Sequence, residues 1–391
     1  MEPETHVHWT DYISMLLVMF AILVGAWYLL IWLNPVSAIN PFPPERIALQ
    51  PEVVPAGGEP AGQGGGSSAF PPTWTPTPRG EPTATATRFP TWTPLPTSTP
   101  TPVPTRDPRW QFYVSGMRGQ RYKGGEVSIY GTFGETPKYT TYLIFYTSES
   151  LRISGMMNVP KGRGSFPVII LCHGYIHPNK YATGNDTWRE ADYLAQRGYI
   201  TIAPDYRSHA GSDNGTSFFH VGYAEDVLNL ISSLHTVKKA DQSRIGLWGH
   251  SMGGGVALKA AVVSKKVDAV AVFGSVSADE RTNYYAGLGN GPGALGIAWF
   301  GSPDNNRLGY KRVSSINYLD RIRALSIHHG TGDQIVPYKW SEELYAAAQD
   351  EQVPSELFLY KGGTHTLSGK DWDLAMERTL KFYDTYVKNG G

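Results

Sequence analysis

Hydrophobic and polar residues follow three different patterns along the 391 residues of this chain. An uncharged, hydrophobic run occupies residues 12–33, and a stretch with few large apolar residues follows over 34–108. From residue 109 onward, short apolar runs alternate with amphipathic segments, which is the pattern of a folded core. We therefore predict an N-terminal tail (1–11), a transmembrane helix, a linker and one folded domain (109–391).

The run over residues 12–33 is long enough to cross a hydrocarbon core of about 30 Å as a helix. Its last turns carry Trp27, Tyr28 and Trp32, as expected for aromatic residues at a membrane interface. The alternative is a cleaved signal peptide, because residues 36–38 resemble a cleavage site. The run is long for a signal peptide and no Lys or Arg precedes it, so we predict a single membrane anchor and a lipid bilayer as partner.

The segment over residues 34–108 is rich in proline, threonine and glycine, and it contains related Trp-centred motifs at 72–78 and 90–96. Such a composition cannot bury a core and predicts an extended, disordered stalk. A stalk of this kind favours a folded domain outside the cytoplasm, whereas Arg46, by the positive-inside rule, favours the opposite orientation. The two motifs could instead bind a proline-recognising partner.

Two kinds of apolar run predict two kinds of strand in the folded part. Aromatic and β-branched residues alternate over 127–130, 141–146 and 151–155, which is typical of antiparallel strands. After Pro167 the runs become fully apolar and are separated by helical segments, which indicates buried parallel strands with helices on both faces of the sheet. These runs lie at residues 168–172, 199–203, 245–248, 267–273, 325–328 and 357–360. The predicted fold class is α/β with a mostly parallel central sheet.

Charge and cysteine content narrow the possible partners. The chain has 34 basic and 34 acidic residues, so its net charge gives no reason to expect nucleic acid as a partner. Its one cysteine, Cys172, lies in an apolar run and is predicted to be a buried structural residue. His328 and His329 lack the spacing and company of metal ligands, and we predict neither a metal nor a cofactor.

Residues 249–253 have the sequence Gly-His-Ser-Met-Gly, directly after a predicted strand and at the start of a helix rich in small residues. A serine on such a strand-to-helix turn projects its hydroxyl, and the helix N-terminus stabilises negative charge. We therefore predict Ser251 as a nucleophile and His250 as a packing residue of the turn.

A serine nucleophile needs a general base, and the base needs an orienting carboxylate. Asp333 stands in a glycine-rich turn after one predicted strand, and His365 follows the next strand. Because the carboxyl ends of parallel strands share one edge of the sheet, we predict His365 as the base and Asp333 as its acid. Asp205, another carboxylate at a strand end, is predicted to anchor its own loop through backbone N–H groups and Arg207.

Donors for a developing oxyanion are predicted at two places. Met252 follows the nucleophile and offers its backbone N–H, and Tyr175, after the first parallel strand, could offer its backbone N–H or its phenol. His173, two residues earlier, is predicted to fasten loops through its ring nitrogens.

Residues 278–309 form an insertion between two predicted strands and could cover the nucleophile as a short cap. We predict that its aromatic residues Tyr284, Tyr285, Trp299 and Phe300 line an apolar substrate pocket, and its glycines would allow it to move. The alternative is an excursion packed on the surface.

From about Ile153 to the C-terminus, several motifs together resemble the catalytic domain of the prolyl oligopeptidase family of serine peptidases and related esterases. The motifs are at residues 167–174, 205–207, 211–212, 249–254, 315–318, 329–333 and 336–337. The resemblance implies the α/β-hydrolase fold, with nucleophile, acid and base at Ser251, Asp333 and His365.

Peptidases of that family also carry an N-terminal β-propeller, and the roughly 50 residues from 109 to 153 are too few for one. The resemblance therefore implies a serine hydrolase without a propeller, acting on a small ester or peptide through an acyl-enzyme. Three possibilities stay open: an ester hydrolase, a peptidase, and a non-catalytic binding protein of the same fold. The third would require a broken triad, whereas the sequence contains all three residues.

Overall fold

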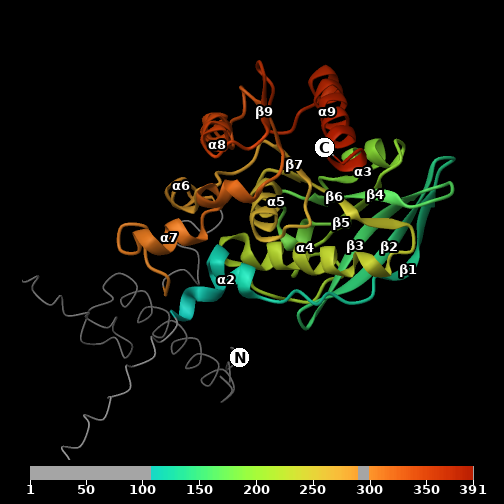
Figure 1. Ribbon diagram of the computed structural model, residues 1–391, viewed down its shortest axis with the longest axis horizontal. Helices are drawn as coiled ribbons and strands as arrows, with labels where there is room; N and C mark the ends of the chain where they lie inside the picture. The colour runs from blue at the N-terminus through green and yellow to red at the C-terminus, as the bar shows by residue number, and fades with distance from the viewer. Residues whose placement is uncertain (1–106, 289–298, 391) are drawn as a thin grey trace, which may run out of the picture. The chain divides into compact units, whose positions relative to one another are not determined.

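The computed structural model describes residues 107–288 and 299–390 of the chain (Figure 1). The predicted membrane helix, nearly all of the predicted linker and residues 289–298 of the predicted insertion lie outside these ranges. Between residues 107 and 390, leaving out that gap, no helix combines the length and apolar character of a membrane span. The domain boundary at residue 109 stays a prediction.

A nine-stranded sheet, in the order β1-β2-β3-β5-β4-β6-β7-β8-β9, organises the described residues. The strands β1, β2 and β3 run antiparallel to their neighbours, and β4 to β9 run parallel to one another. The prediction of antiparallel strands followed by a mostly parallel sheet is confirmed. The strand bounds are β1 Ser128–Glu135, β2 Tyr139–Ser148, β3 Leu151–Pro160, β4 Phe166–Cys172, β5 Ile200–Pro204, β6 Ala240–His250, β7 Ala269–Phe273, β8 Leu325–Gly330 and β9 Ser355–Tyr360.

Helices cover both faces of the sheet (Figure 1), which explains why the parallel strands are apolar on both sides. The helices α4, α5 and α8 pack on one face, and α3 and α9 pack on the other. Short helices α2, α6 and α7 are the remaining α-helices of the residues that the structure describes. The bounds are α2 Val114–Gly119, α3 Trp188–Ala195, α4 Val221–Ser233, α5 Met252–Val263, α6 Glu280–Tyr285, α7 Arg307–Val313, α8 Lys339–Asp350 and α9 Gly369–Tyr383.

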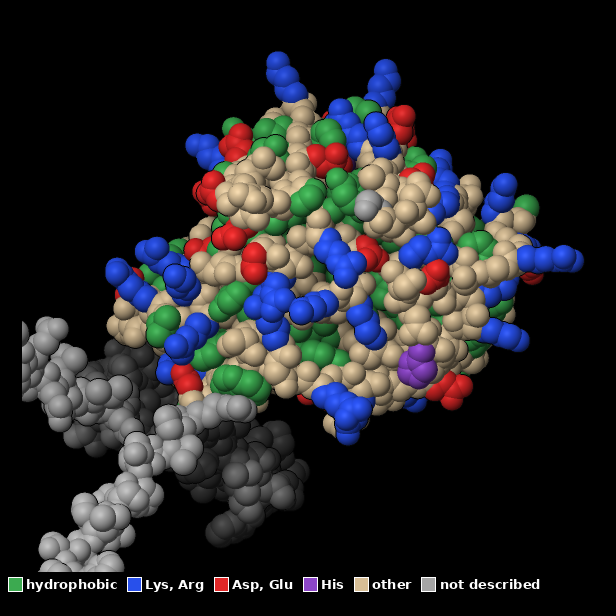
Figure 2. All heavy atoms as spheres, in the orientation of Figure 1, with side chains coloured by type: hydrophobic (Ala, Val, Ile, Leu, Met, Phe, Trp, Pro, Cys, Tyr) green, Lys and Arg blue, Asp and Glu red, His purple; other side chains and the backbone are tan. Residues whose placement is uncertain are grey.

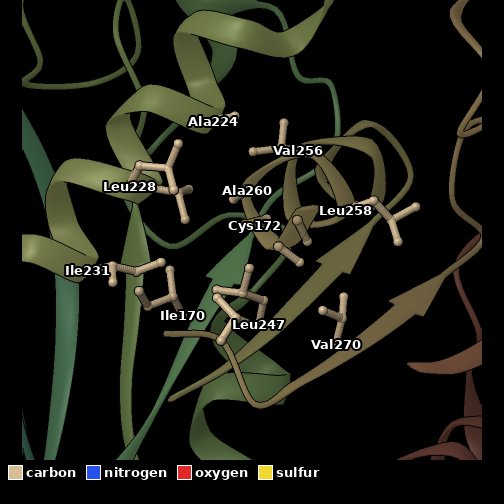
Figure 3. Close-up of a cluster of buried hydrophobic side chains, with 14 of the residues drawn as sticks. Ile170, Cys172, Ala224, Leu228, Ile231, Leu247, Val256, Leu258, Ala260 and Val270 are labelled. Atoms are coloured by element: carbon tan, nitrogen blue, oxygen red, sulfur yellow. The ribbon is translucent and has the colours of Figure 1, made fainter. Parts of the chain in front are cut away.

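Side chains of β4 alternate between the two cores, as the period of two in a strand requires. Ile170 and Cys172 belong to the core shared with α4 and α5, and Ile169 and Leu171 belong to the core shared with α3 and α9. Figure 3 shows Ile170 in the first core, together with Leu247 of β6 and side chains from both helices. Cys172 is fully buried, as predicted, and burial raises the pKa of its thiol to about 12. It is therefore a structural residue.

The surface seen in Figure 2 has basic and acidic side chains interspersed, and its hydrophobic side chains form small separate areas. On this face there is no broad apolar surface of the kind that marks a docking site. The predicted catalytic residues Ser251, Asp333 and His365 lie beyond the carboxyl ends of parallel strands β6, β8 and β9.

Candidate active site

Ser251 lies on the sharp turn that joins β6 to α5. Its backbone has φ 54° and ψ −121°, a conformation that residues other than glycine rarely adopt. The turn is held in place because the Ser251 N–H donates to the Phe273 carbonyl (2.9 Å) and the Ser251 carbonyl accepts from Gly254 (3.0 Å) and Val276 (3.1 Å). The strained strand-turn-helix geometry that exposes a nucleophilic hydroxyl is therefore present at this serine.

Close backbone packing explains the two glycines on either side of Ser251. A Cβ atom at Gly253 would lie 1.9 Å from the Cys172 carbonyl oxygen, and one at Gly249 would lie 2.3 Å from the Gly253 carbonyl oxygen. No side chain fits at either distance. The motif at 249–253 thus meets a steric requirement of the turn.

Asp333, just past β8, lies 2.7 Å from His365 Nδ1 through its Oδ2 atom. Its other oxygen accepts the backbone N–H groups of Ile335 (2.8 Å) and Val336 (2.9 Å). Burial by itself raises the pKa of this carboxyl, but hydrogen bonds from His329 and His365 outweigh burial and hold the pKa well below its usual range. Asp333 is therefore an ionised carboxylate that fixes the orientation of His365.

His329 was predicted not to be a metal ligand, and no other role was predicted for it. In the structure it lies against Asp333. Its Nε2 lies 3.0 Å from Asp333 Oδ2 and 3.1 Å from the Val336 carbonyl, while Nδ1 lies 2.6 Å from Ser341 Oγ. Because both neighbours of Nε2 are acceptors, Nε2 carries the proton and donates it. His329 thus helps to hold Asp333 by donating a hydrogen bond to it, a role that its position near the end of β8, four residues before Asp333, could have suggested.

Ser251 and His365 border one pocket of about 650 Å³, which lies within the range of roughly 300–1,000 Å³ typical of small-molecule sites. Met252 and Tyr175, the two predicted oxyanion donors, border the same pocket. Much of the remaining wall is apolar, formed by Ile176, Val276, Leu288, Ile335 and Val336. The described structure therefore brings the predicted reacting groups to one cavity suited to an uncharged substrate group.

Gly174 and Tyr175, in the loop after β4, both border the pocket that contains Ser251, and the backbone N–H of Gly174 is already bonded. The Gly174 N–H donates to Asp186 Oδ2 at 2.6 Å. Tyr175, the next residue, borders the pocket, and its side chain is 68% exposed. Tyr175 is therefore the remaining candidate donor of this loop.

The four aromatic residues that were predicted to line the pocket lie elsewhere. Phe300 is buried with its ring centroid 4.6 Å from that of Phe219, and Trp299 packs 5.1 Å from Phe112. The two tyrosines of α6 pack against each other with centroids 5.4 Å apart. The described part of the insertion reaches the pocket through Asn283, Gly287 and Leu288 instead. Trp299 and Phe300 thus fasten the insertion to the body of the domain, and the two tyrosines pack on each other. The prediction that Tyr284, Tyr285, Trp299 and Phe300 line the pocket is therefore wrong.

Asp205 is a buried structural carboxylate. It accepts three side-chain hydroxyl groups, those of Ser154 (2.6 Å), Thr183 (2.8 Å) and Tyr181 (3.0 Å). Arg207 pairs with Asp226 at 2.8 Å instead. Asp205 does anchor its loop, but the predicted partners are corrected, because hydroxyl groups take the place of backbone N–H groups and Arg207.

His173 fastens this region as predicted, since its ring nitrogens lie 2.7 Å from the Gly174 carbonyl and 3.2 Å from the Asp205 carbonyl. Burial is the main reason why its pKa is lowered to about 4. It is therefore a buried structural histidine. Across residues 107–288 and 299–390, no group of three or more His, Cys, Asp or Glu side chains is placed to hold a metal ion.

Comparison with protein families gives a match for residues 186–390, just over half of the chain, to the prolyl oligopeptidase family. Among curated proteins, an uncharacterized 31.7 kDa protein in the traX-finO intergenic region of Escherichia coli is 29% identical over 153 residues, which are 36% of this chain and 51% of that protein. The chain thus spans about half the length of that relative. The uncharacterized protein YfhR of Escherichia coli K12 is 24% identical over 256 residues, covering 64% of this chain and 82% of YfhR.

Solved structures share the fold. Acetyl xylan esterase 1 from a Thermoanaerobacterium species superposes with a TM-score of 0.53 at 21% identity, covering 70% of this chain and 92% of the esterase. A puromycin-hydrolyzing peptidase of Mycobacterium tuberculosis superposes with a TM-score of 0.54 at 19% identity, covering 65% of this chain and 40% of the peptidase. Esterases and peptidases are therefore both similar to this chain in fold.

Proposed function

Because the chain belongs to the prolyl oligopeptidase family and is a serine hydrolase, we propose that it cleaves small esters or peptides through Ser251, His365 and Asp333. The observation that carries this proposal is the convergence of two features on one pocket. Ser251 stands there on a strained turn, and His365 stands there with its Nδ1 held 2.7 Å from Asp333.

The proposed mechanism follows from which atoms are already engaged. Since Nδ1 of His365 donates to Asp333, Nε2 is the nitrogen that accepts the Ser251 proton as the serine oxygen attacks the substrate carbonyl. The backbone N–H of Met252 and a donor from Tyr175 stabilise the oxyanion. Imidazolium then protonates the leaving group, and an acyl-enzyme remains. Water, deprotonated by the same histidine, releases the acid and restores the serine.

Ester substrates are favoured over peptides with a free amino terminus by the charges at the pocket. Its one carboxylate among the described lining residues is Asp186, which is already bonded to His250 and to the Gly174 N–H. A substrate ammonium would therefore find no unpaired acid there, and leaving it unpaired in an apolar pocket is costly. A peptidase remains the second candidate, because the fold is also that of a puromycin-hydrolyzing peptidase.

We expect purified full-length protein in detergent to turn over p-nitrophenyl acetate and butyrate, and to show a kcat/KM lower by about 100-fold or more for dipeptidyl p-nitroanilides with a free amino terminus. N-acylated dipeptidyl p-nitroanilides serve as the matched control, because they keep the amide bond and lack the ammonium. If the free-amino substrates are cleaved better than the acylated ones, the site recognises an amino terminus and the peptidase candidate is correct.

We also propose that residues 12–33 anchor the enzyme in a membrane and that the catalytic domain lies outside the cytoplasm. The uncharged length of that run and the Pro/Thr-rich composition of residues 34–108 support this. Protease added to intact cells is expected to cut within 34–108 and to release a soluble, active fragment. Activity that stays protected until the cells are lysed would show the opposite orientation.

A further inference from the structure

Asp186 and His250 border the pocket but take no part in the steps proposed above. His250 Nδ1 lies 2.9 Å from both carboxylate oxygens of Asp186, and Asp186 Oδ2 also accepts the Gly174 N–H at 2.6 Å. On the other side of the imidazole, Nε2 lies 3.1 Å from the carbonyl oxygen of His365. The His250 side chain is 9% exposed and that of Asp186 is 18% exposed, so these contacts are largely shielded from water.

These contacts join three parts of the active site that are far apart in the sequence. Gly174 precedes the candidate oxyanion donor Tyr175, His250 precedes Ser251, and the His365 carbonyl belongs to the general base itself. The imidazole rings of His250 and His365 also pack with centroids 4.8 Å apart. One chain of hydrogen bonds therefore runs from the oxyanion loop through the nucleophile turn to the base.

The charges of the pair suit this arrangement. Both ring nitrogens of His250 face acceptors, which the doubly protonated ring satisfies completely. Burial by itself lowers the pKa of His250, but the Asp186 carboxylate outweighs burial and raises it. Asp186 also adopts φ 66°, so its backbone is strained at the point where its side chain reaches the pair. Such strain persists only where surrounding contacts hold it.

We propose that Asp186 and His250 are positioning residues, which hold the oxyanion loop, Ser251 and His365 in their reactive arrangement. The inference rests on the proposed function of Ser251, and it assigns no contact with substrate to either residue. A displacement of about 1 Å between reacting groups can cost about 100-fold in rate. The pair therefore acts on kcat through geometry.

Asp186→Ala is expected to lower kcat for p-nitrophenyl butyrate by about 100-fold while KM stays within about threefold, because the apolar residues of the pocket wall stay in place. Asp186→Asn is expected to recover most of this loss. Its amide oxygen can accept the Gly174 N–H, and its NH₂ group can donate to Nδ1 of a neutral His250 that keeps its Nε2 proton for the His365 carbonyl. The rate of labelling by a fluorophosphonate probe should follow the same order.

Asn158→Ala is the matched control for stability. Asn158 is 2% exposed and is bonded to Thr141 (2.8 Å) and Thr201 (3.0 Å), among residues that do not border the pocket. It should lower the thermal midpoint without changing kcat. If kcat of Asp186→Ala equals that of the wild type, or if Asn158→Ala loses as much kcat at an equal fall in thermal midpoint, the positioning role is refuted.

Two further variants keep the result decisive. Should Asp186→Ala fail to fold, His250→Phe, which keeps a ring and removes both hydrogen bonds, replaces it and is expected to show the same loss of kcat at unchanged KM. Ser251→Ala is assayed in parallel. Turnover retained by Ser251→Ala refutes the proposed function, whereas an inactive Ser251→Ala beside a fully active Asp186→Ala refutes only the positioning role.

Discussion

Ser251→Ala is expected to abolish hydrolysis of activated esters, with a fall in kcat on the order of 10⁶, together with all labelling by fluorophosphonate probes. The reason is that the attacking oxygen is lost and no neighbouring group is placed like it. Thr366 carries the other aliphatic hydroxyl in the described pocket wall, and it belongs to the His365 loop, not to the strained turn. Steady-state rates on p-nitrophenyl esters and the rate of probe labelling measure the effect.

Cys172→Ser provides the control for this experiment. The thiol is fully buried, and its pKa of about 12 leaves almost none of it as thiolate at neutral pH, so activity should change by no more than a few fold. Labelling at full rate in Ser251→Ala would place the nucleophile elsewhere. A complete loss of activity in Cys172→Ser with folding intact would bring the thiol back as a candidate.

Asp333→Asn is expected to lose about 10⁴-fold in kcat while the protein stays folded. The carboxylate accepts from His365 and His329 through one oxygen and from two backbone N–H groups through the other. An amide of the same shape keeps one acceptor oxygen and presents N–H donors where acceptors are needed. The tautomer of His365 is then no longer fixed, and its imidazolium loses the compensating charge.

Asp205→Asn is the matched comparison, since it makes the same chemical change at another strand end. Its three hydroxyl donors hold a loop, so the amide should lower the thermal midpoint before it lowers kcat. Measuring both quantities for both variants separates the two roles. A well-folded but inactive Asp205→Asn beside an active Asp333→Asn would mean that Asp205, not Asp333, is the acid of the triad.

Local patterns in the sequence were sufficient to predict the mostly parallel sheet and the turn at Ser251. The apolar runs of β4 to β9 report burial on both faces, and the two glycines around Ser251 report a backbone that leaves no room for Cβ atoms. Asp333 and His365 could be located because parallel strands end at one edge of the sheet. The structure places these two side chains 2.7 Å apart.

Contacts between distant segments could not be predicted in this way. His250 meets Asp186, 64 residues before it, and the His365 carbonyl, 115 residues after it, and no periodic pattern relates these positions. The aromatic residues of the insertion show a different limit. An aromatic side chain such as Phe300 is expected to be in an apolar environment, but the sequence does not show whether that environment is a substrate pocket or a packed contact. In the structure it is a packed contact with Phe219.

The position of β4 shows that the segment matched by the family and the segment that forms the sheet are not the same. The family match begins at residue 186, after β4 has ended, yet β4 lies between β5 and β6 near the middle of the sheet. A fragment cut at residue 186 would leave two central strands with unpaired backbone groups and would lack the loop that carries Gly174 and Tyr175. Sequence similarity alone is therefore a poor guide for trimming this protein, and a shortened version has to begin before β1.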